Sequence, residues 1–275
     1  PPTYAHLQAS DVVNINADAA TYEVRLTTLS LLPDGRIECT GKYNNAAVYT
    51  SAAVGEAGAV TGQVLTYAGT TAMTLMDIPC VDSARMDRAG LLFGMSGYYD
   101  GWPGGHVYAS SDSGQSWAYL SSATKPGIAN ATASHALAAG VTHVVDVKNT
   151  LNVRMTYGVF SSVSDLAMFN GANHFAIGAH GRWEIVAAKT IYDEADGTCT
   201  LSHLMRGRFG TEWAMTTHAI GDVVVLLDIA QLGFINMAAS DINMVKLWRG
   251  VTNGRSVDSA SETPIAYAGV NLECL

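Results

Sequence analysis

The sequence predicts a mainly β protein, with barrel or sandwich domains and a few short helices. Apolar and polar residues alternate in several short segments, for example residues 22–27, as strands with one buried face require. Turn-forming residues separate these segments. The clearest turn is formed by Pro33, Asp34 and Gly35, because Pro fixes φ and Gly accepts a positive φ. The chain has no long amphipathic helical pattern and no repeat of fixed period.

The chain of 275 residues is poor in charge, with 14% charged residues against about 25% in an average protein. Two interpretations stay open: partners cover much of the surface, or the protein is simply rich in uncharged strand residues. The net charge of −9 and the lack of a basic run argue against a nucleic-acid-binding face. No apolar stretch approaches the roughly 20 residues of a membrane-spanning helix.

The four cysteines are far apart and form no CxxC pair, so the common zinc spacings are absent. We expect isolated buried thiols in a reducing compartment, although the sequence leaves a disulfide open. The first residues carry neither a basic segment nor an apolar core, so we expect no signal peptide. We interpret the start on Pro1 and Pro2 as a cut within a longer protein or as a processed product.

The chain is expected to divide into three segments. Residues 1–60 form the first, in which residues 22–27 and 36–40 pair as a hairpin. A stretch rich in Gly and Ala marks the boundary to the second segment, residues 61–230, which we expect to be a β-rich domain. The third, residues 231–275, is expected to be irregular apart from two candidate strands, at residues 243–248 and 264–268.

Short elements are expected inside the second segment. Residues 91–95 form an apolar run typical of a buried strand. Residues 131–139 and 163–169 predict two short helices, the second with Ser164 as its N-cap and a stop at Asn170.

Residues 110–117 fit the Asp-box pattern S-x-D-x-G-x-[ST]-W. In such a box the carboxylate of Asp112 and nearby hydroxyls bind the turn backbone, and Trp117 packs beneath the turn. The favoured interpretation is a structural tie of a β-hairpin. Because sialidase-type propellers carry several such boxes, a glycan contact nearby is the alternative.

Trp102 lies among glycines beside Tyr98 and Tyr99. An exposed aromatic cluster usually marks an interface, so these residues predict either a binding surface or a subunit contact.

The stretch 198–228 carries the densest set of polar candidates, between two strands that we expect to be buried. Arg206, Arg208 and Glu212 predict either an anion-binding turn or a charge-assisted network. We favour the network, in which the arginines pair with Glu212 or a neighbouring carboxylate and Trp213 packs under the turn.

Residues that would carry catalysis are not evident. Asp193, Glu194 and Asp196 read as a solvated hairpin loop rather than as the acid pair of a glycoside hydrolase. His180 and Glu184 would share a strand face, but no third metal ligand accompanies them. We therefore expect no catalytic residue, no cofactor and no metal, and a protein that is not an enzyme.

Three stretches together resemble the large tail-tip hub proteins of long-tailed bacteriophages and of the gene transfer agents derived from them. The family segments are LLDIPLL…DAGLY, GWxGAxLYRSxDGG and LSGLLRGRRGTE, and the similar stretches here are residues 75–79 with 89–91, 101–114 and 201–212. The third is the most specific, and it departs from the family at His203, where Gly is usual, and at Phe209, where a basic residue is usual.

The resemblance implies a structural role in a viral tail. It implies a baseplate hub that joins the tail tube and the distal tail ring to host-recognition parts. The partners would be further copies in a homotrimer, the distal tail protein, and other hub and tape-measure-type proteins. The location would be the virion tail tip, assembled in the bacterial cytoplasm. Residues 1–60 would be the closing strands of the hub module. A module for host attachment that binds surface glycan is the alternative, and a glycan hydrolase is disfavoured.

Overall fold

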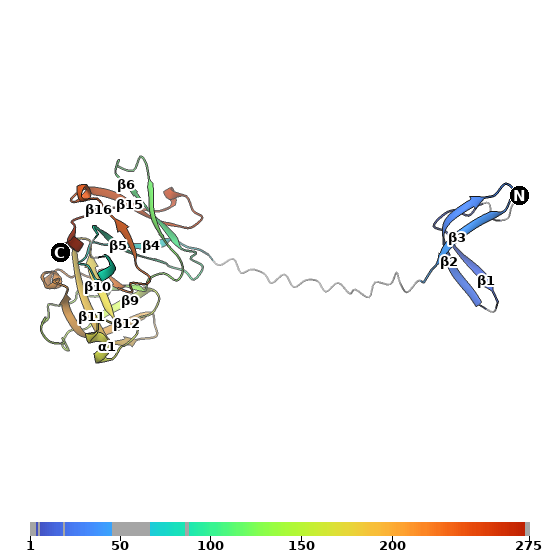
Figure 1. Ribbon diagram of the computed structural model, residues 1–275. Coiled ribbons are helices and arrows are strands. Elements are labelled where there is room, and N and C mark those ends of the chain that lie inside the picture. Colours follow the sequence, from blue (N-terminus) through green and yellow to red (C-terminus); the bar gives the residue numbers. More distant parts are fainter. Residues whose placement is uncertain (1–3, 5, 19, 46–66, 86–87, 273–275) are drawn as a thin grey trace. The chain divides into compact units, whose positions relative to one another are not determined.

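The computed structural model describes residue 4 and residues 6–18, 20–45, 67–85 and 88–272. These residues form a mainly β protein with a few short helical turns, as the alternation in the sequence predicts. The chain divides into two compact units, residues 1–64 and residues 65–275, which are described separately (Figure 1). The predicted boundary between residues 60 and 61 lies outside the described residues.

The first unit is an antiparallel three-stranded sheet in the order β1-β2-β3. Its strands are β1 (Val12–Ala17), β2 (Ala20–Leu31) and β3 (Ile37–Tyr43). The pairing of β2 with β3 confirms the predicted hairpin. Gly35 in its turn has a φ of +82°, and the backbone N–H of Arg36 donates to the Asp34 carboxylate.

One face of this sheet is apolar. Ile15 stands directly opposite Tyr22, and Val24 opposite Tyr43, so these side chains share a face. The apolar face consists of Val13, Ile15, Tyr22, Val24, Leu26 and Tyr43. Among them only Leu26 is buried, and Ile15, Tyr22 and Tyr43 are exposed. The described residues of the first unit therefore form no second layer over this face.

The second unit contains a closed barrel of six strands, in the order β10-β11-β12-β9-β8-β13. Its strands are β8 (Asn130–Ala133), β9 (Leu151–Tyr157), β10 (His174–Ala179), β11 (Arg182–Asp193), β12 (Thr198–Arg208) and β13 (Val223–Leu226). Inward-facing side chains such as Leu151, Val153, Phe175 and Leu201 fill the barrel and are fully buried.

Two further sheets belong to this unit. One has the order β14-β5-β4 and the other β16-β15-β6-β7. Their strands are β4 (Thr71–Met76), β5 (Gly90–Gly97), β6 (Gly105–Ser110), β7 (Ala118–Ala123), β14 (Gly233–Asn236), β15 (Val245–Thr252) and β16 (Glu262–Ala266). Every residue of β5 is buried, which confirms the buried strand expected at residues 91–95.

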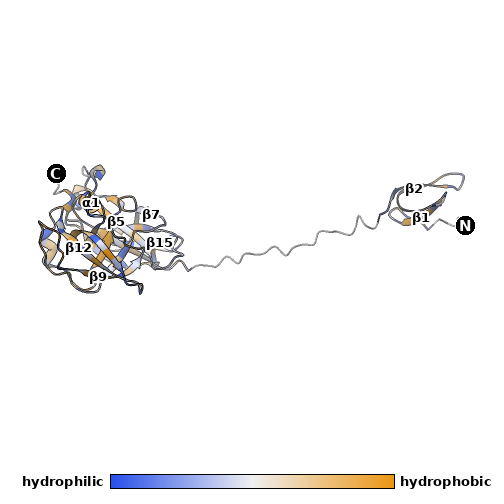
Figure 2. Cartoon of the chain, turned by 90° about the horizontal axis from the view of Figure 1, so that it is seen from below, coloured by the Kyte–Doolittle hydropathy of each residue, from blue (hydrophilic) through white to orange (hydrophobic). Residues whose placement is uncertain are grey.

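Three apolar clusters hold the second unit together. Besides the barrel interior, one cluster joins the two sheets, with Phe93 and Trp248 at its centre. Another joins the barrel to the β14-β5-β4 sheet, where Leu92 meets Ile185 and Val225. Hydrophobic residues accordingly gather on the central strands of this unit (Figure 2). Because β5 contributes to both joining clusters, barrel and sheets form one compact unit.

The short helical elements differ in part from expectation. α1 (Asp165–Phe169) is confirmed, and the Ser164 hydroxyl accepts from the Ala167 N–H as its cap. In the described part of the chain, the remaining helical turns are the 3-10 segments η2 (Ser83–Arg85), η3 (Glu212–Thr216), η4 (Ala239–Asp241), η5 (Val257–Ser259) and η6 (Val270–Leu272). The helix predicted at residues 131–139 is wrong. Strand β8 begins there, because pairing with β9 and β13 outweighs the helix propensity of alanine.

The last segment is more regular than predicted. Strands β15 and β16 overlap the two strands expected at residues 243–248 and 264–268, whereas β14 lies in a part that was expected to be irregular. Strand β15 has a mixed pattern (VKLWRGVT), and its buried residues are Trp248, Val251 and Thr252. Long-range pairing with β6 extends this strand to Thr252, beyond the predicted end at Trp248.

Two further observations concern the whole described chain. No helix among the described residues has the length and hydrophobicity needed to span a membrane. Cys39, Cys80 and Cys199 carry free thiols, and Cys274 lies outside the described residues.

Candidate functional site

The polar segment that begins at the end of β12 is shaped by glycine and by an irregularity of strand pairing. The register between β11 and β12 shifts between Ile185 and Ala187, so β12 carries an extra residue next to Arg206. Gly207 has a φ of +59°, and a Cβ there would lie 2.8 Å from the Cα of Glu212. Only glycine therefore fits this turn, which directs the Arg206 side chain into the protein.

Arg206 forms a bidentate ion pair with Glu184 of β11. Its Nε and Nη2 donate to Oε1 and Oε2 of Glu184 at 2.8 Å each, and both side chains are fully buried. The backbone N–H of Gly207 donates to the same carboxylate. The predicted pairing with a neighbouring carboxylate is therefore confirmed for Arg206 alone, and Glu184 is that carboxylate.

The third nitrogen of Arg206 reaches a loop that precedes β9. Nη1 donates to the carbonyl of Ala138 at 2.8 Å and lies 3.6 Å from the carboxylate of Asp146. Asp146 is itself held by backbone hydrogen bonds in both directions with Leu204 and by the side-chain amide of Asn149. Arg206 thus ties the 138–149 loop to the barrel wall.

On its other side Glu184 contacts His218. The ring Nε2 lies 2.6 Å from Glu184 Oε2, and Nδ1 lies 3.3 Å from Asp222 Oδ2. Asp222 also receives hydrogen bonds from both terminal nitrogens of Arg182. We call the six side chains the buried charge network: Asp146, Arg206, Glu184, His218, Asp222 and Arg182.

Hydrogen bonds keep the carboxylates of the network ionised. Burial raises the pKa of Glu184, but hydrogen bonds from His218 and Arg206 outweigh it, so this pKa lies below its usual value. Burial likewise raises the pKa of Asp222, and hydrogen bonds from Arg182 and the Ala219 amide bring it below its usual value. Three carboxylates face two guanidinium groups, and each ring nitrogen of His218 lies within hydrogen-bond distance of one of these carboxylates.

The network suits a structural task. The side chains of Glu184 and Arg206 are inaccessible, those of His218 and Asp222 are 1% and 2% exposed, and only Arg182 is appreciably accessible at 30%. A substrate therefore has no direct path to the carboxylates or the imidazole. What the arrangement does is connect β11, β12, the 138–149 loop and the turn before β13.

The other three candidates of the turn lie apart from this network. Arg208 is half-buried, and its Nε has no hydrogen-bond partner among the described residues. Glu212 is exposed at the start of η3. The prediction that Trp213 packs under the turn is wrong, because this side chain is 55% exposed. Thr211 occupies the buried position instead, where its hydroxyl accepts from the Ile185 N–H and donates to the Arg208 carbonyl.

The Asp-box forms the turn between β6 and β7. The Asp112 carboxylate accepts from the Ser110 hydroxyl and the Ser116 N–H, which lowers the pKa of Asp112. Trp117 stacks under the guanidinium of Arg249, 4.1 Å from the ring centroid. These contacts and the pairing of β6 with β7 confirm that the box ties a hairpin.

Trp102 is not part of an aromatic surface. It is 1% exposed, and its indole N–H donates to the Thr71 hydroxyl at 2.9 Å. A Cβ on Gly97 would lie 2.2 Å from Trp102, so the glycine makes room for the buried ring. The prediction of a binding surface at Trp102 is therefore wrong, whereas Tyr98 and Tyr99 are exposed.

Asp77 is a structural residue that sequence reasoning singled out only as part of a motif. Its carboxylate accepts the backbone N–H groups of Ala268, Gly269 and Val270 at 2.6 to 3.1 Å. Burial raises the pKa of Asp77 above its usual value, although these three amides act in the opposite direction. Asp77 therefore ties the end of β4 to the C-terminal turn.

Sequence reasoning missed most partners of Arg206. Glu184 gave a usable signal, because it is a lone acid in the apolar run of residues 183–188, and buried acids need a partner. His218, Asp222 and Asp146 gave no such signal, since they lie in irregular segments. No cluster of three or more His, Cys, Asp or Glu side chains in the described part of the chain could hold a metal ion.

The second unit is thus a six-stranded β-barrel that packs against two further sheets, and buried ion pairs connect the strands and loops of the barrel. Residues 129–225 match the family model described as Rcc01698-like, C-terminal. The matched range begins just before β8 and ends within β13, so it coincides with the barrel and contains all six network residues. No curated protein matches the chain.

Proposed function

We propose that this chain is a structural component of the tail tip or baseplate hub of a phage or phage-like particle. There it would link the tail tube and the distal tail ring to host-recognition parts. The observation that carries the proposal is the apolar face of the first unit, of whose six side chains only Leu26 is buried. A three-stranded sheet needs its apolar face covered for stability, so this one suits a subunit that is completed by an assembly.

The three stretches that resemble tail-tip hub proteins also support a structural role. Each contains a buried polar or aromatic side chain that ties distant segments together: Asp77, Trp102 and Arg206. None of the three is available to a small-molecule substrate, since each is 6% exposed or less. The resembling residues thus act on the fold, which is what an assembly protein requires.

The proposed partners follow from the resemblance. They are further copies of the chain in a homotrimer, the distal tail protein, and other hub and tape-measure-type proteins. The proposed location is the virion tail tip, after assembly in the bacterial cytoplasm. The low charge of the chain suits a surface that several partners cover.

The test is incorporation of the full chain into particles. A tagged chain is expressed during particle production, and gold labelling of the tag is viewed by electron microscopy. We expect label at the tail tip and a copy number that is a multiple of three by native mass spectrometry. Ile15→Glu, on the apolar face, should abolish incorporation, whereas Asn14→Glu, on the opposite face of the same strand, should not.

Two results would count against this proposal. One is a monodisperse monomer that never co-purifies with tail proteins. The other is equal incorporation of the Ile15→Glu and Asn14→Glu variants, because the apolar face would then have no partner in the particle.

A further inference from the structure

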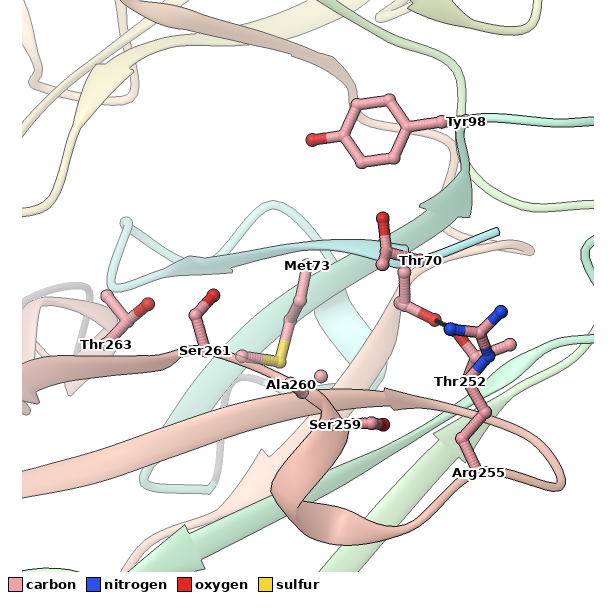
Figure 3. A pocket seen from close by; sticks show the side chains of 11 residues that line it. Thr70, Met73, Tyr98, Thr252, Arg255, Ser259, Ala260, Ser261 and Thr263 are labelled. Atoms are coloured by element: carbon pink, nitrogen blue, oxygen red, sulfur yellow. Dashed lines mark hydrogen bonds between the residues drawn. The ribbon is translucent and has the colours of Figure 1, made fainter. Parts of the chain in front are cut away.

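A polar pocket of about 370 Å³ opens in the second unit, away from the buried charge network (Figure 3). The start of β4, the end of β15 and the segment from η5 to β16 form its floor and sides. Tyr98, which follows β5, stands on the opposite side of the space (Figure 3). The volume lies within the range of about 300–1,000 Å³ that is usual for small-molecule sites.

The pocket is lined by hydroxyl groups, and many of them form no hydrogen bond with the residues that the structure describes. On the floor, the Thr71 and Thr252 hydroxyls bind each other at 2.9 Å, and the Trp102 indole N–H fixes Thr71. Four other lining residues are exposed, and the hydroxyl of each forms no side-chain hydrogen bond with the described residues: Thr70, Tyr98, Ser261 and Thr263. Each free hydroxyl can both donate and accept a hydrogen bond. The pocket therefore offers hydrogen-bond donors and acceptors to a ligand, above a floor whose hydroxyls are already paired.

Arg255 supplies the charge of the pocket. It is the one charged residue among those described as lining it, and it is exposed. Its guanidinium lies 5.6 Å from the ring centroid of Tyr67 and forms no ion pair with a described carboxylate. The acids of the neighbouring segment, Asp258 and Glu262, pair with Arg249 instead. The pocket therefore favours an anion, although the chain as a whole is acidic.

We propose that this pocket binds an acidic saccharide, such as a uronic acid residue of an oligosaccharide. The free hydroxyls would exchange hydrogen bonds with the sugar hydroxyls, and the exposed ring of Tyr98 would pack against the apolar face of the sugar. The guanidinium of Arg255 matches a carboxylate in shape and charge. The inference does not depend on the tail-tip proposal, because it rests on a different surface of the molecule.

The test uses the full chain with tri-galacturonic acid and its fully methyl-esterified counterpart, measured by calorimetry or NMR at low salt. We expect the acid to bind with a Kd of about 1 mM or tighter, and the neutral ester to bind about tenfold more weakly. Arg255→Gln should remove this preference for the acid. Tyr98→Ala should weaken binding of both compounds.

Control variants separate this site from general surface effects. Arg154→Gln removes an exposed arginine of β9, and Tyr119→Ala removes a tyrosine of β7 that is as exposed as Tyr98, at 55%. Both should bind like the unchanged protein. Because Tyr98 and Arg255 are exposed, their variants should unfold at unchanged denaturant concentration.

Three results would overturn the proposal. The first is no binding of the acid, and the second is equal affinity for acid and ester. The third is competition by inorganic phosphate at the same concentration as the acid, because the pocket would then recognise an anion without recognising a sugar. A failure here leaves the incorporation test of the tail-tip proposal unaffected.

Discussion

Arg206 and Glu184 face each other through two parallel N–H···O hydrogen bonds of 2.8 Å, with both side chains fully buried. The pair also holds the 138–149 loop through Ala138 and the turn before β13 through His218. A buried ion pair gains little net stability over apolar residues of the same shape, but losing one partner leaves a charge buried alone. The pair therefore fixes which segments meet, and substitution of either residue alone should lower the free energy of unfolding strongly.

We first predict the cost of breaking this pair. Arg206→Met leaves Glu184 ionised and without its main partner, so the free energy of unfolding should fall by about 3–5 kcal/mol. Urea denaturation followed by tryptophan fluorescence measures the change. Lys189→Met is the matched control, because Lys189 pairs with Asp165 at an accessible position, and it should cost about 1 kcal/mol or less. Equal costs for the two variants would contradict the role assigned to the network.

A second prediction concerns acid. The pKa of Glu184 is lower in the folded protein than its ordinary value of 4.5, so the folded state binds this proton less readily than the unfolded state. The stability that Glu184 contributes is present above the unfolded pKa and is lost as the pH falls through the folded pKa. Below about pH 4.5 the unchanged protein should therefore lose stability steeply.

The Glu184→Gln variant isolates this contribution. It should be less stable than the unchanged protein at neutral pH, and the difference should shrink as the pH falls below 4.5, because Gln has no proton to gain. Asp222 and Asp146, whose pKa values are also lowered, keep their own acid dependence in both proteins. Urea titrations over a series of pH values measure the difference. A gap of constant size at every pH would contradict the prediction.

The third prediction concerns the tie between β4 and the C-terminal turn. Asp77→Ala removes the acceptor of three backbone amides, and we expect a loss of about 3 kcal/mol in the free energy of unfolding. Hydrogen exchange should accelerate at Ala268, Gly269 and Val270. Asp100→Ala, at an exposed position, is the control and should change neither quantity. Unchanged exchange in the Asp77→Ala variant would show that the turn is held by other contacts.

Local chemistry explains what the sequence predicts well. The hairpin at Gly35, the cap at Ser164 and the Asp-box around Asp112 each depend on residues a few positions apart. The mainly β class likewise follows from alternation within single strands. Such features can be read from sequence because the groups that stabilise them are neighbours in the chain.

Long-range contacts explain what the sequence does not predict. Glu184 and His218 are 34 residues apart, and their contact exists only because the barrel closes. The burial of Trp102 depends on Gly97 and Thr71, and the exposure of Trp213 on the position of Thr211 beneath the turn. In each case residue type indicates the chemistry, and the tertiary fold decides the partner and the burial.

His203 has an unusual backbone conformation within β12. Its φ is +55°, in the left-handed region that residues with a Cβ adopt at a cost. Its side chain is half-buried, and its ring Nδ1 lies 3.3 Å from the Ser202 hydroxyl. In the tail-tip hub segment that this stretch resembles, glycine is usual at this position, and glycine adopts a positive φ without the steric cost.

The fourth prediction is therefore that His203→Gly stabilises the protein. Removing the Cβ should relieve strain worth about 1 kcal/mol, which exceeds the loss of one long side-chain contact. Ser202→Gly is the matched control, because the neighbouring residue has no positive φ and should lose about 0.5–1 kcal/mol on the same change. Urea denaturation of both variants measures the change in the free energy of unfolding, which should be positive for His203→Gly and negative for Ser202→Gly. If His203→Gly lowered stability as much as Ser202→Gly, the side chain of His203 would have to contribute more than its backbone conformation costs.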